Sequence, residues 1–139
     1  MKTKNRISTF VILIAVLVIA TNMGCKKYPE GPMISFHSRA ERVANTWKVD
    51  NYKINGSDYT SLVAGYTEMY TKEGNYSYSW GGVNGTGTWV FQNKDSEIRI
   101  TGTSNQSDYT LVILKLEEKQ FWYYYMDGKD KKEFHMIQK

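Results

Sequence analysis

The sequence predicts an all-β domain, an eight-stranded antiparallel up-and-down barrel preceded by one short helix. Residues 33–139 contain no proline, and strand-like patterns recur after residue 45 at steps of about 8 to 14 residues. Glycine, asparagine or aspartate separates these patterns, which is typical of tight turns between antiparallel neighbours, and no segment is long enough for a parallel crossover. Because eight meandering strands can close and remove their exposed edges, we expect a closed barrel, with an open β-sandwich as the alternative.

The helix is expected over residues 39–44, directly before the first strand. Ser38 and Glu41 have the spacing of a capping box, in which each side chain satisfies a free backbone amide of the other residue. The apolar positions at roughly helical spacing are Phe36, Ala40, Val43 and Trp47. This face should cover part of the barrel.

Eight strands are expected, at 46–54, 65–72, 75–80, 87–93, 97–102, 109–117, 121–126 and 131–138. Alternation predicts which side of each strand is buried. The predicted buried faces carry Tyr76, Tyr78 and Trp80; Trp89 and Phe91; Ile98 and Ile100; and Val112, Leu114 and Leu116. The glycine-rich stretch 81–87 is expected to be a flexible loop at the barrel mouth.

The N-terminus has the three parts of a secretory signal. Lys2, Lys4 and Arg6 precede the apolar run 10–20, and small residues follow it. The run is too short for a permanent membrane span. We therefore expect a signal peptide over residues 1–24.

Cys25 is the only cysteine of the chain, so no disulfide can form within it. Met23-Gly24-Cys25 resembles the lipobox of bacterial lipoproteins, although Asn22 stands where an aliphatic residue is usual. The resemblance implies cleavage after Gly24 and a lipid on Cys25. Residues 25–36, which hold both prolines, should then be an acylated flexible tether outside the core, followed by the barrel domain 37–139.

A wider resemblance follows from the short helix, the strand pattern and the segment Asn45-Thr46-Trp47. The chain resembles the lipocalin-like lipoproteins of Gram-negative envelopes, whose Gly-x-Trp motif closes the narrow end of the barrel. Trp47 matches the motif and Asn45 replaces its glycine. The resemblance implies an outer-membrane location and capture of a small hydrophobic or amphipathic ligand.

Candidate ligand-binding residues are the inward aromatics Tyr76, Tyr78, Trp80, Trp89 and Phe91. Glu68 lies between two tyrosines on one strand face and would be a polar anchor if that face were interior. Because an unpaired buried carboxylate is costly, we expect instead that Glu68 meets water and that Thr67, Met69 and Thr71 turn inward. Eight strands leave little interior space, so a filled barrel that acts as a structural or protein-interaction module is the alternative.

Strand 121–126 has aromatic residues on both faces, so one face must point outward. Either Phe121, Tyr123 and Tyr125 or Trp122 and Tyr124 would then form an interaction face for a partner protein or a second copy of the chain.

Several functions are not expected. Without residues 1–24 the chain has 15 basic and 14 acidic side chains, a balance that gives no reason to expect nucleic acid. His37 and His135 have no companions at metal-ligand spacing, and no nucleophile motif or phosphate-binding loop is present. We expect a non-enzymatic protein without metal or cofactor.

Overall fold

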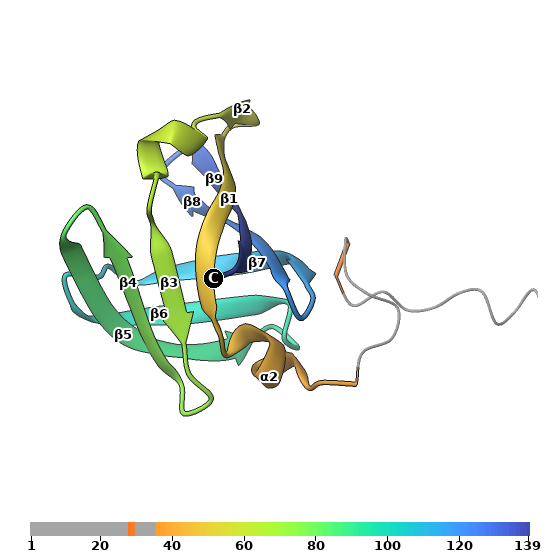
Figure 1. The fold of residues 1–139 in the computed structure, drawn as a ribbon. Coiled ribbons are helices and arrows are strands. Elements are labelled where there is room, and N and C mark those ends of the chain that lie inside the picture. The colour runs from red at the N-terminus through yellow and green to blue at the C-terminus, as the bar shows by residue number, and fades with distance from the viewer. Residues whose placement is uncertain (1–27, 30–35) are drawn as a thin grey trace, which may run out of the picture.

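The domain is a closed antiparallel barrel of eight strands with one short extra strand outside it, as the computed structural model of the chain shows (Figure 1). The structure describes residues 28–29 and 36–139. Helix α2 (Arg39–Val43) precedes the barrel. The all-β prediction is confirmed, and the closed barrel rather than the open sandwich is correct.

The barrel strands follow one another as a meander. They are β1 (Thr46–Ile54), β3 (Thr67–Tyr70), β4 (Asn75–Trp80), β5 (Val83–Gln92), β6 (Glu97–Ser104), β7 (Tyr109–Leu116), β8 (Gln120–Asp127) and β9 (Asp130–Gln138). The extra strand β2 (Ser57–Asp58) and the 3-10 helix η1 (Thr60–Val63) connect β1 to β3.

Pairing of β1 with β9 closes the barrel, from Trp47 opposite Gln138 to Ile54 opposite Lys132. β1 pairs with β3 only over Thr46–Lys48, and β2 pairs with the far end of β1. The barrel therefore has two different ends: α2 lies at the start of β1, whereas β2 and η1 lie at its far end (Figure 1).

Helix α2 closes its end of the barrel, as the sequence predicts, but its predicted apolar face is only half correct: Val43 and Trp47 are buried, whereas Phe36 (98%) and Ala40 are exposed. The capping box of Ser38 and Glu41 is formed, and it fixes the start of the helix. Trp47 is completely buried, and its indole Nε1 donates to the carbonyl of Val43 at 2.9 Å. Arg42 donates from Nη1 to the carbonyl of Leu116 at 2.6 Å, which ties the helix to the end of β7.

Tyr28 belongs to the same end of the molecule. Only 2% of this residue is exposed, it is part of the core cluster, and its hydroxyl donates to the carbonyl of Asp95 at 2.9 Å. Burial raises the pKa of the Tyr28 phenol from 10.0 to about 12. The expected tether therefore does not stay outside the core at this residue, because burying an aromatic ring is itself favourable.

The glycine-rich stretch is not a flexible loop, and that prediction is wrong. Only Gly81 and Gly82 form a turn, both with positive φ (56° and 86°), as a two-residue hairpin between β4 and β5 requires. Gly85 and Gly87 lie within β5, opposite Tyr78 and Tyr76. A Cβ on Gly85 would lie 2.1 Å from Tyr78 Cε1, so glycine here makes room for a tyrosine ring.

The predicted inner face of β7 is also wrong at two positions. Leu111 and Ile113 are buried, whereas Val112 and Leu114 are only partly buried. A register shift after Ile113 then brings Leu116 to the interior. Strict alternation fails here because a bulge adds one residue to the strand.

Trp47→Ala is expected to lower the free energy of unfolding by about 3 to 5 kcal/mol, because it leaves a cavity under α2 and removes the bond to Val43. Chemical denaturation measures this loss. Trp80→Ala is the control, since Trp80 is 44% exposed and should cost less than about 1 kcal/mol. A loss below about 1 kcal/mol for Trp47→Ala would contradict closure of the barrel by this residue.

Candidate functional site: the open end of the barrel

The end of the barrel opposite α2 holds a cavity of about 370 Å³. Four tyrosine rings line it: Tyr66, Tyr78, Tyr109 and Tyr125. The loop 105–108 and residues 126–127, where β8 ends, complete the lining. The rings come from four places in the chain, so only the closed barrel brings them together.

The tyrosine rings contact one another in two pairs. The centroids of Tyr66 and Tyr78 lie 5.9 Å apart with the rings nearly parallel, and those of Tyr109 and Tyr125 lie 4.9 Å apart. Phe134 supports both pairs, at 5.7 Å from Tyr66 and 6.2 Å from Tyr125. Because the rings pack against each other and against the core, the aromatic lining is held in place before any ligand arrives.

Glu68 lies beneath this cavity and is 1% exposed. Its carboxylate accepts hydrogen bonds from four phenol hydroxyls. Oε1 accepts from Tyr66 (2.9 Å), Tyr76 (3.0 Å) and Tyr123 (2.9 Å), and Oε2 accepts from Tyr70 (3.0 Å). The expectation that Glu68 meets water is wrong: Met69 is the residue that points outward, at 46% exposure. The carboxylate is tolerated inside because it is not unpaired.

No cation compensates this charge within the described part of the chain, since none of the ion pairs formed there involves Glu68. Burial raises the pKa of the Glu68 carboxyl, while the hydrogen bonds from Tyr66, Tyr123, Tyr76 and Tyr70 act in the opposite direction. Hydrogen bonds from the phenol hydroxyls thus stabilise the buried carboxylate, as a positively charged partner does in an ion pair.

The phenols of the cluster are protected from ionisation. Burial first, and the Glu68 carboxylate second, raise the pKa of Tyr66, Tyr76, Tyr109 and Tyr123 far above the ordinary value of 10.0. At neutral pH these residues therefore act as hydrogen-bonding groups and ring surfaces, and not as bases.

Acidic side chains stand at the rim. Asp108 accepts from Arg99 Nη2 at 2.9 Å and from the backbone amide of Gly102 at 2.8 Å, and Asp127 pairs with Lys132. The lining of the cavity includes these two carboxylates and no lysine or arginine.

The ligand-binding candidates are only partly brought together. Tyr78 lines the cavity, Tyr76 and Glu68 lie beneath it, and Trp80 lies two residues beyond Tyr78 on the same strand face but outside the lining. Trp89 is buried against Tyr70 near the other end of the barrel, 5.4 Å from Phe91. The expected single site differs because the inward residues of β5 opposite Tyr76 and Tyr78 are glycines, and the next inward position after them is already Trp89.

Three of the four lining tyrosines were not among the sequence-based ligand candidates: Tyr66, Tyr109 and Tyr125. The alternation of Tyr66, Glu68 and Tyr70 was a usable signal, since three inward polar-tipped residues on one strand need partners inside. Tyr109 gave no such signal because it stands at the first residue of its strand.

The interaction-face alternatives are decided by burial. Phe121 and Tyr123 are fully buried and Tyr125 lines the cavity, so this face of β8 points inward and cannot be the interaction face. Trp122 and Tyr124 are on the outer side. Lys115 Nζ lies 4.4 Å from the Trp122 ring centroid, and Lys131 Nζ lies 4.5 Å from that of Tyr124, so basic side chains cover both rings.

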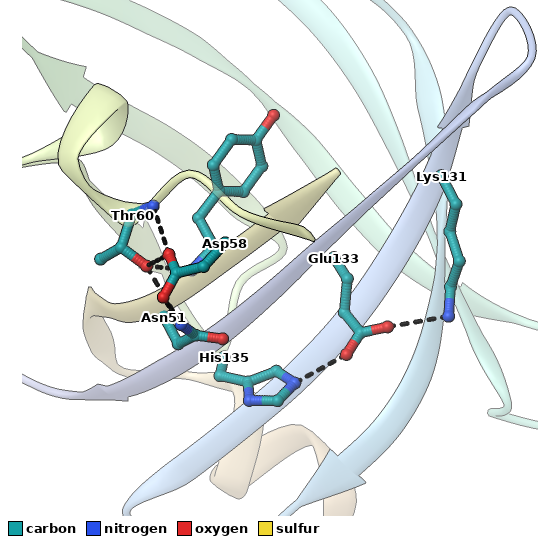
Figure 2. A network of polar contacts seen from close by, with 7 residues as sticks. Asn51, Asp58, Thr60, Lys131, Glu133 and His135 are labelled. Carbon is teal, nitrogen blue, oxygen red and sulfur yellow. Dashed lines mark hydrogen bonds and ion pairs between the residues drawn. The ribbon is translucent and has the colours of Figure 1, made fainter. Parts of the chain in front are cut away.

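The outer wall beside these rings carries two groups of polar contacts (Figure 2). In the first, the Asn51 amide donates to Asp58 (3.2 Å) and Thr60 (3.1 Å), and the Thr60 hydroxyl donates to Asp58 at 2.7 Å. These bonds hold β2 and η1 against β1, where β1 no longer pairs with β3. The group therefore stabilises the wall of the open end.

The second group runs along β9, where Glu133 lies between Lys131 and His135 with 2.8 Å contacts to each (Figure 2). Partial burial tends to raise the pKa of Glu133, but hydrogen bonds from these two neighbours outweigh it and lower the pKa. The His135 ring stacks on Trp122 with centroids 4.0 Å apart. All three polar side chains are engaged within the wall.

Two further properties concern the described residues alone. Within 28–29 and 36–139, no group of three or more His, Cys, Asp or Glu side chains is arranged to hold a metal ion. The same residues form no helix with the length and hydropathy needed to cross a bilayer. Gly24 and Cys25 lie outside the described residues.

Comparison of the sequence with protein-family models and with curated proteins found no match. The class of protein that the fold defines is a small antiparallel β-barrel, and the resemblance to lipocalin-like lipoproteins stays a prediction.

The Glu68 carboxyl is expected to titrate above its ordinary value of 4.5, and Tyr123→Phe should raise the midpoint further by removing one donor. NMR of the Glu68 side-chain carbon measures both. Because the native carboxyl holds its proton more tightly than the unfolded chain, its contribution to stability is complete below pH 4.5 and is lost as the pH rises through the native pKa. Tyr59→Phe, at an exposed tyrosine, should leave the midpoint unchanged. A wild-type midpoint at or below 4.5 would refute this account.

Proposed function

We propose that this protein is a lipocalin-like binder of one small amphipathic molecule, held in the bacterial cell envelope by a lipid on Cys25. The observation that carries the binding proposal is the tyrosine-lined cavity of about 370 Å³ at the open end. Small-molecule sites are concave, have mostly apolar walls, and contain a few polar groups that fix orientation. The four tyrosine rings supply apolar wall and their hydroxyls supply polar groups, while the loop 105–108 and Asp127 make the rest of the lining polar.

The size of the guest follows from how the barrel is filled. Below Glu68 the interior is occupied by the chain's own side chains, including the fully buried Trp47, Ile98 and Leu111. A guest can therefore enter only the part of the barrel between Glu68 and the open end. The cavity lies near the small end of the usual range of about 300 to 1,000 Å³, which favours a compact molecule over a long acyl chain.

The anchor rests on the sequence alone. A basic start, an apolar run and a single cysteine directly after Gly24 support lipid attachment at Cys25, and an exported chain with one thiol otherwise leaves that thiol unexplained. Two or three acyl chains would hold the protein stably at the membrane. An outer-membrane location is part of this proposal.

Native mass spectrometry of the protein recovered from its own envelope tests the binding proposal. We expect a small adduct that is retained in Tyr124→Leu and lost in Tyr125→Leu, because these adjacent residues lie on the outer wall and in the cavity. Retention of the adduct in both variants would contradict binding at the open end. So would an empty protein whose resonances from residues 105–109 are unchanged by a library of amphipathic molecules; the filled-barrel interaction module would then replace this proposal.

Metabolic labelling with a fatty-acid probe tests the anchor. Wild-type protein is expected to take up the label, and Cys25→Ser is expected to take up none, because the thioether needs the thiol. Equal labelling of both would refute lipid attachment at this residue.

A further inference from the structure

The hydroxyl protons around Glu68 can be counted. Each phenol has one proton to donate, and its oxygen can also accept. Tyr66, Tyr70, Tyr76 and Tyr123 each give that proton to the Glu68 carboxylate. None of the four therefore has a proton left for a ligand.

The count extends to Tyr109. Its hydroxyl lies 3.0 Å from that of Tyr76, and because the proton of Tyr76 is used on Glu68, Tyr109 must be the donor of this bond. Tyr66 and Tyr109, the two members of this network that line the cavity, therefore offer only lone pairs to a guest.

The charge at the open end also favours a guest that is positively charged and donates hydrogen bonds. The Glu68 carboxylate accepts from the cavity-lining Tyr66 and has no ion-pair partner among the described residues, the rim adds Asp108 and Asp127, and no basic side chain lines the space. Arg99 and Lys132 pair with the rim carboxylates, so the unbalanced charge is that of Glu68. A charge in a dry interior is screened less than one in water, and aromatic ring faces attract cations.

We infer that the open end selects an organic ammonium: a compact amphipathic molecule whose cationic head donates to the oxygens of Tyr66 and Tyr109 above the Glu68 carboxylate. This inference rests on the proposed function and adds the chemical class of the ligand. It also assigns Glu68 a role in recognition through the two tyrosines, without direct contact with the guest. An anionic head would leave acceptor facing acceptor, whereas a hydroxyl head can donate one proton but carries no positive charge to interact with the Glu68 carboxylate.

Three probes with the same phenylethyl tail test the class: 2-phenylethylammonium, 2-phenylethanol and 3-phenylpropanoate. Each is titrated into the protein at a pH above the Glu68 midpoint, and resonances of residues 105–109 and 125–127 are followed. We expect the ammonium to bind at least about tenfold more tightly than the alcohol, and the carboxylate to bind most weakly. Equal or tighter binding of the alcohol or the carboxylate would overturn the ammonium assignment while leaving the proposed function intact.

Variants test the route from Glu68 to the guest. Glu68→Gln should reduce ammonium affinity about tenfold and leave the affinity for the alcohol unchanged. Because the amide substitution disturbs four hydrogen bonds, Tyr109→Phe is the second variant: it keeps Glu68 in place, removes one acceptor, and should weaken ammonium binding about threefold to tenfold. Tyr124→Phe on the outer wall is the matched control.

Unchanged ammonium affinity in both Glu68→Gln and Tyr109→Phe would overturn the inference. If none of the three probes binds at millimolar concentration, the ammonium class is wrong, and mass spectrometry of the protein from its own envelope decides separately whether the open end binds any molecule.

Discussion

The hydrogen bonds that Glu68 accepts from four tyrosines connect strands that are far apart in the sequence. Tyr70 lies on the strand of Glu68, Tyr66 directly precedes that strand, Tyr76 comes from β4, and Tyr123 comes from β8, 55 residues away. A buried carboxylate with four donors is stable only when all of them are in place, because each lost donor leaves charge unsatisfied in a dry interior. This requirement selects one register for three strands at once, and it divides the barrel into a filled part and an open part.

Glycines on the inner surface of β5 and β6 leave room for the tyrosine cluster. A Cβ on Gly87 would lie 2.4 Å from the carbonyl oxygen of Thr101, and one on Gly102 would lie 1.7 Å from that of Gln106. Together with Gly85, these glycines let the tyrosine rings and the loop 105–108 approach the sheet closely. Aromatic bulk on β3, β4 and β7 is thus matched by missing bulk on β5 and β6, which is how a small barrel reaches dense packing.

Much of the architecture could be predicted from local patterns. The bounds 46–54 and 75–80 were correct, and the capping box at Ser38 and Glu41 correctly placed the helix, which ends one residue earlier than expected. These features depend on neighbours in the sequence. The burial of Glu68 depends instead on Tyr76 and Tyr123, whose proximity no local pattern encodes. The general penalty for a buried charge therefore led to the wrong prediction that Glu68 faces solvent. The bulge in β7 was not predicted for a similar reason, because only the pairing with the partner strand shows which residue is extra.

Tyr28 has a consequence for how the barrel would be oriented at a membrane. It is docked beside Asp95 and the α2 residue Arg39, so the chain leaves the domain at the closed end. Cys25 precedes Tyr28 by three residues, which span at most about 11 Å even when fully extended. A lipid on Cys25 would therefore hold the closed end against the headgroups and direct the tyrosine-lined mouth away from the bilayer. A guest would then exchange with the aqueous space, and it would not pass laterally from the lipid into the protein.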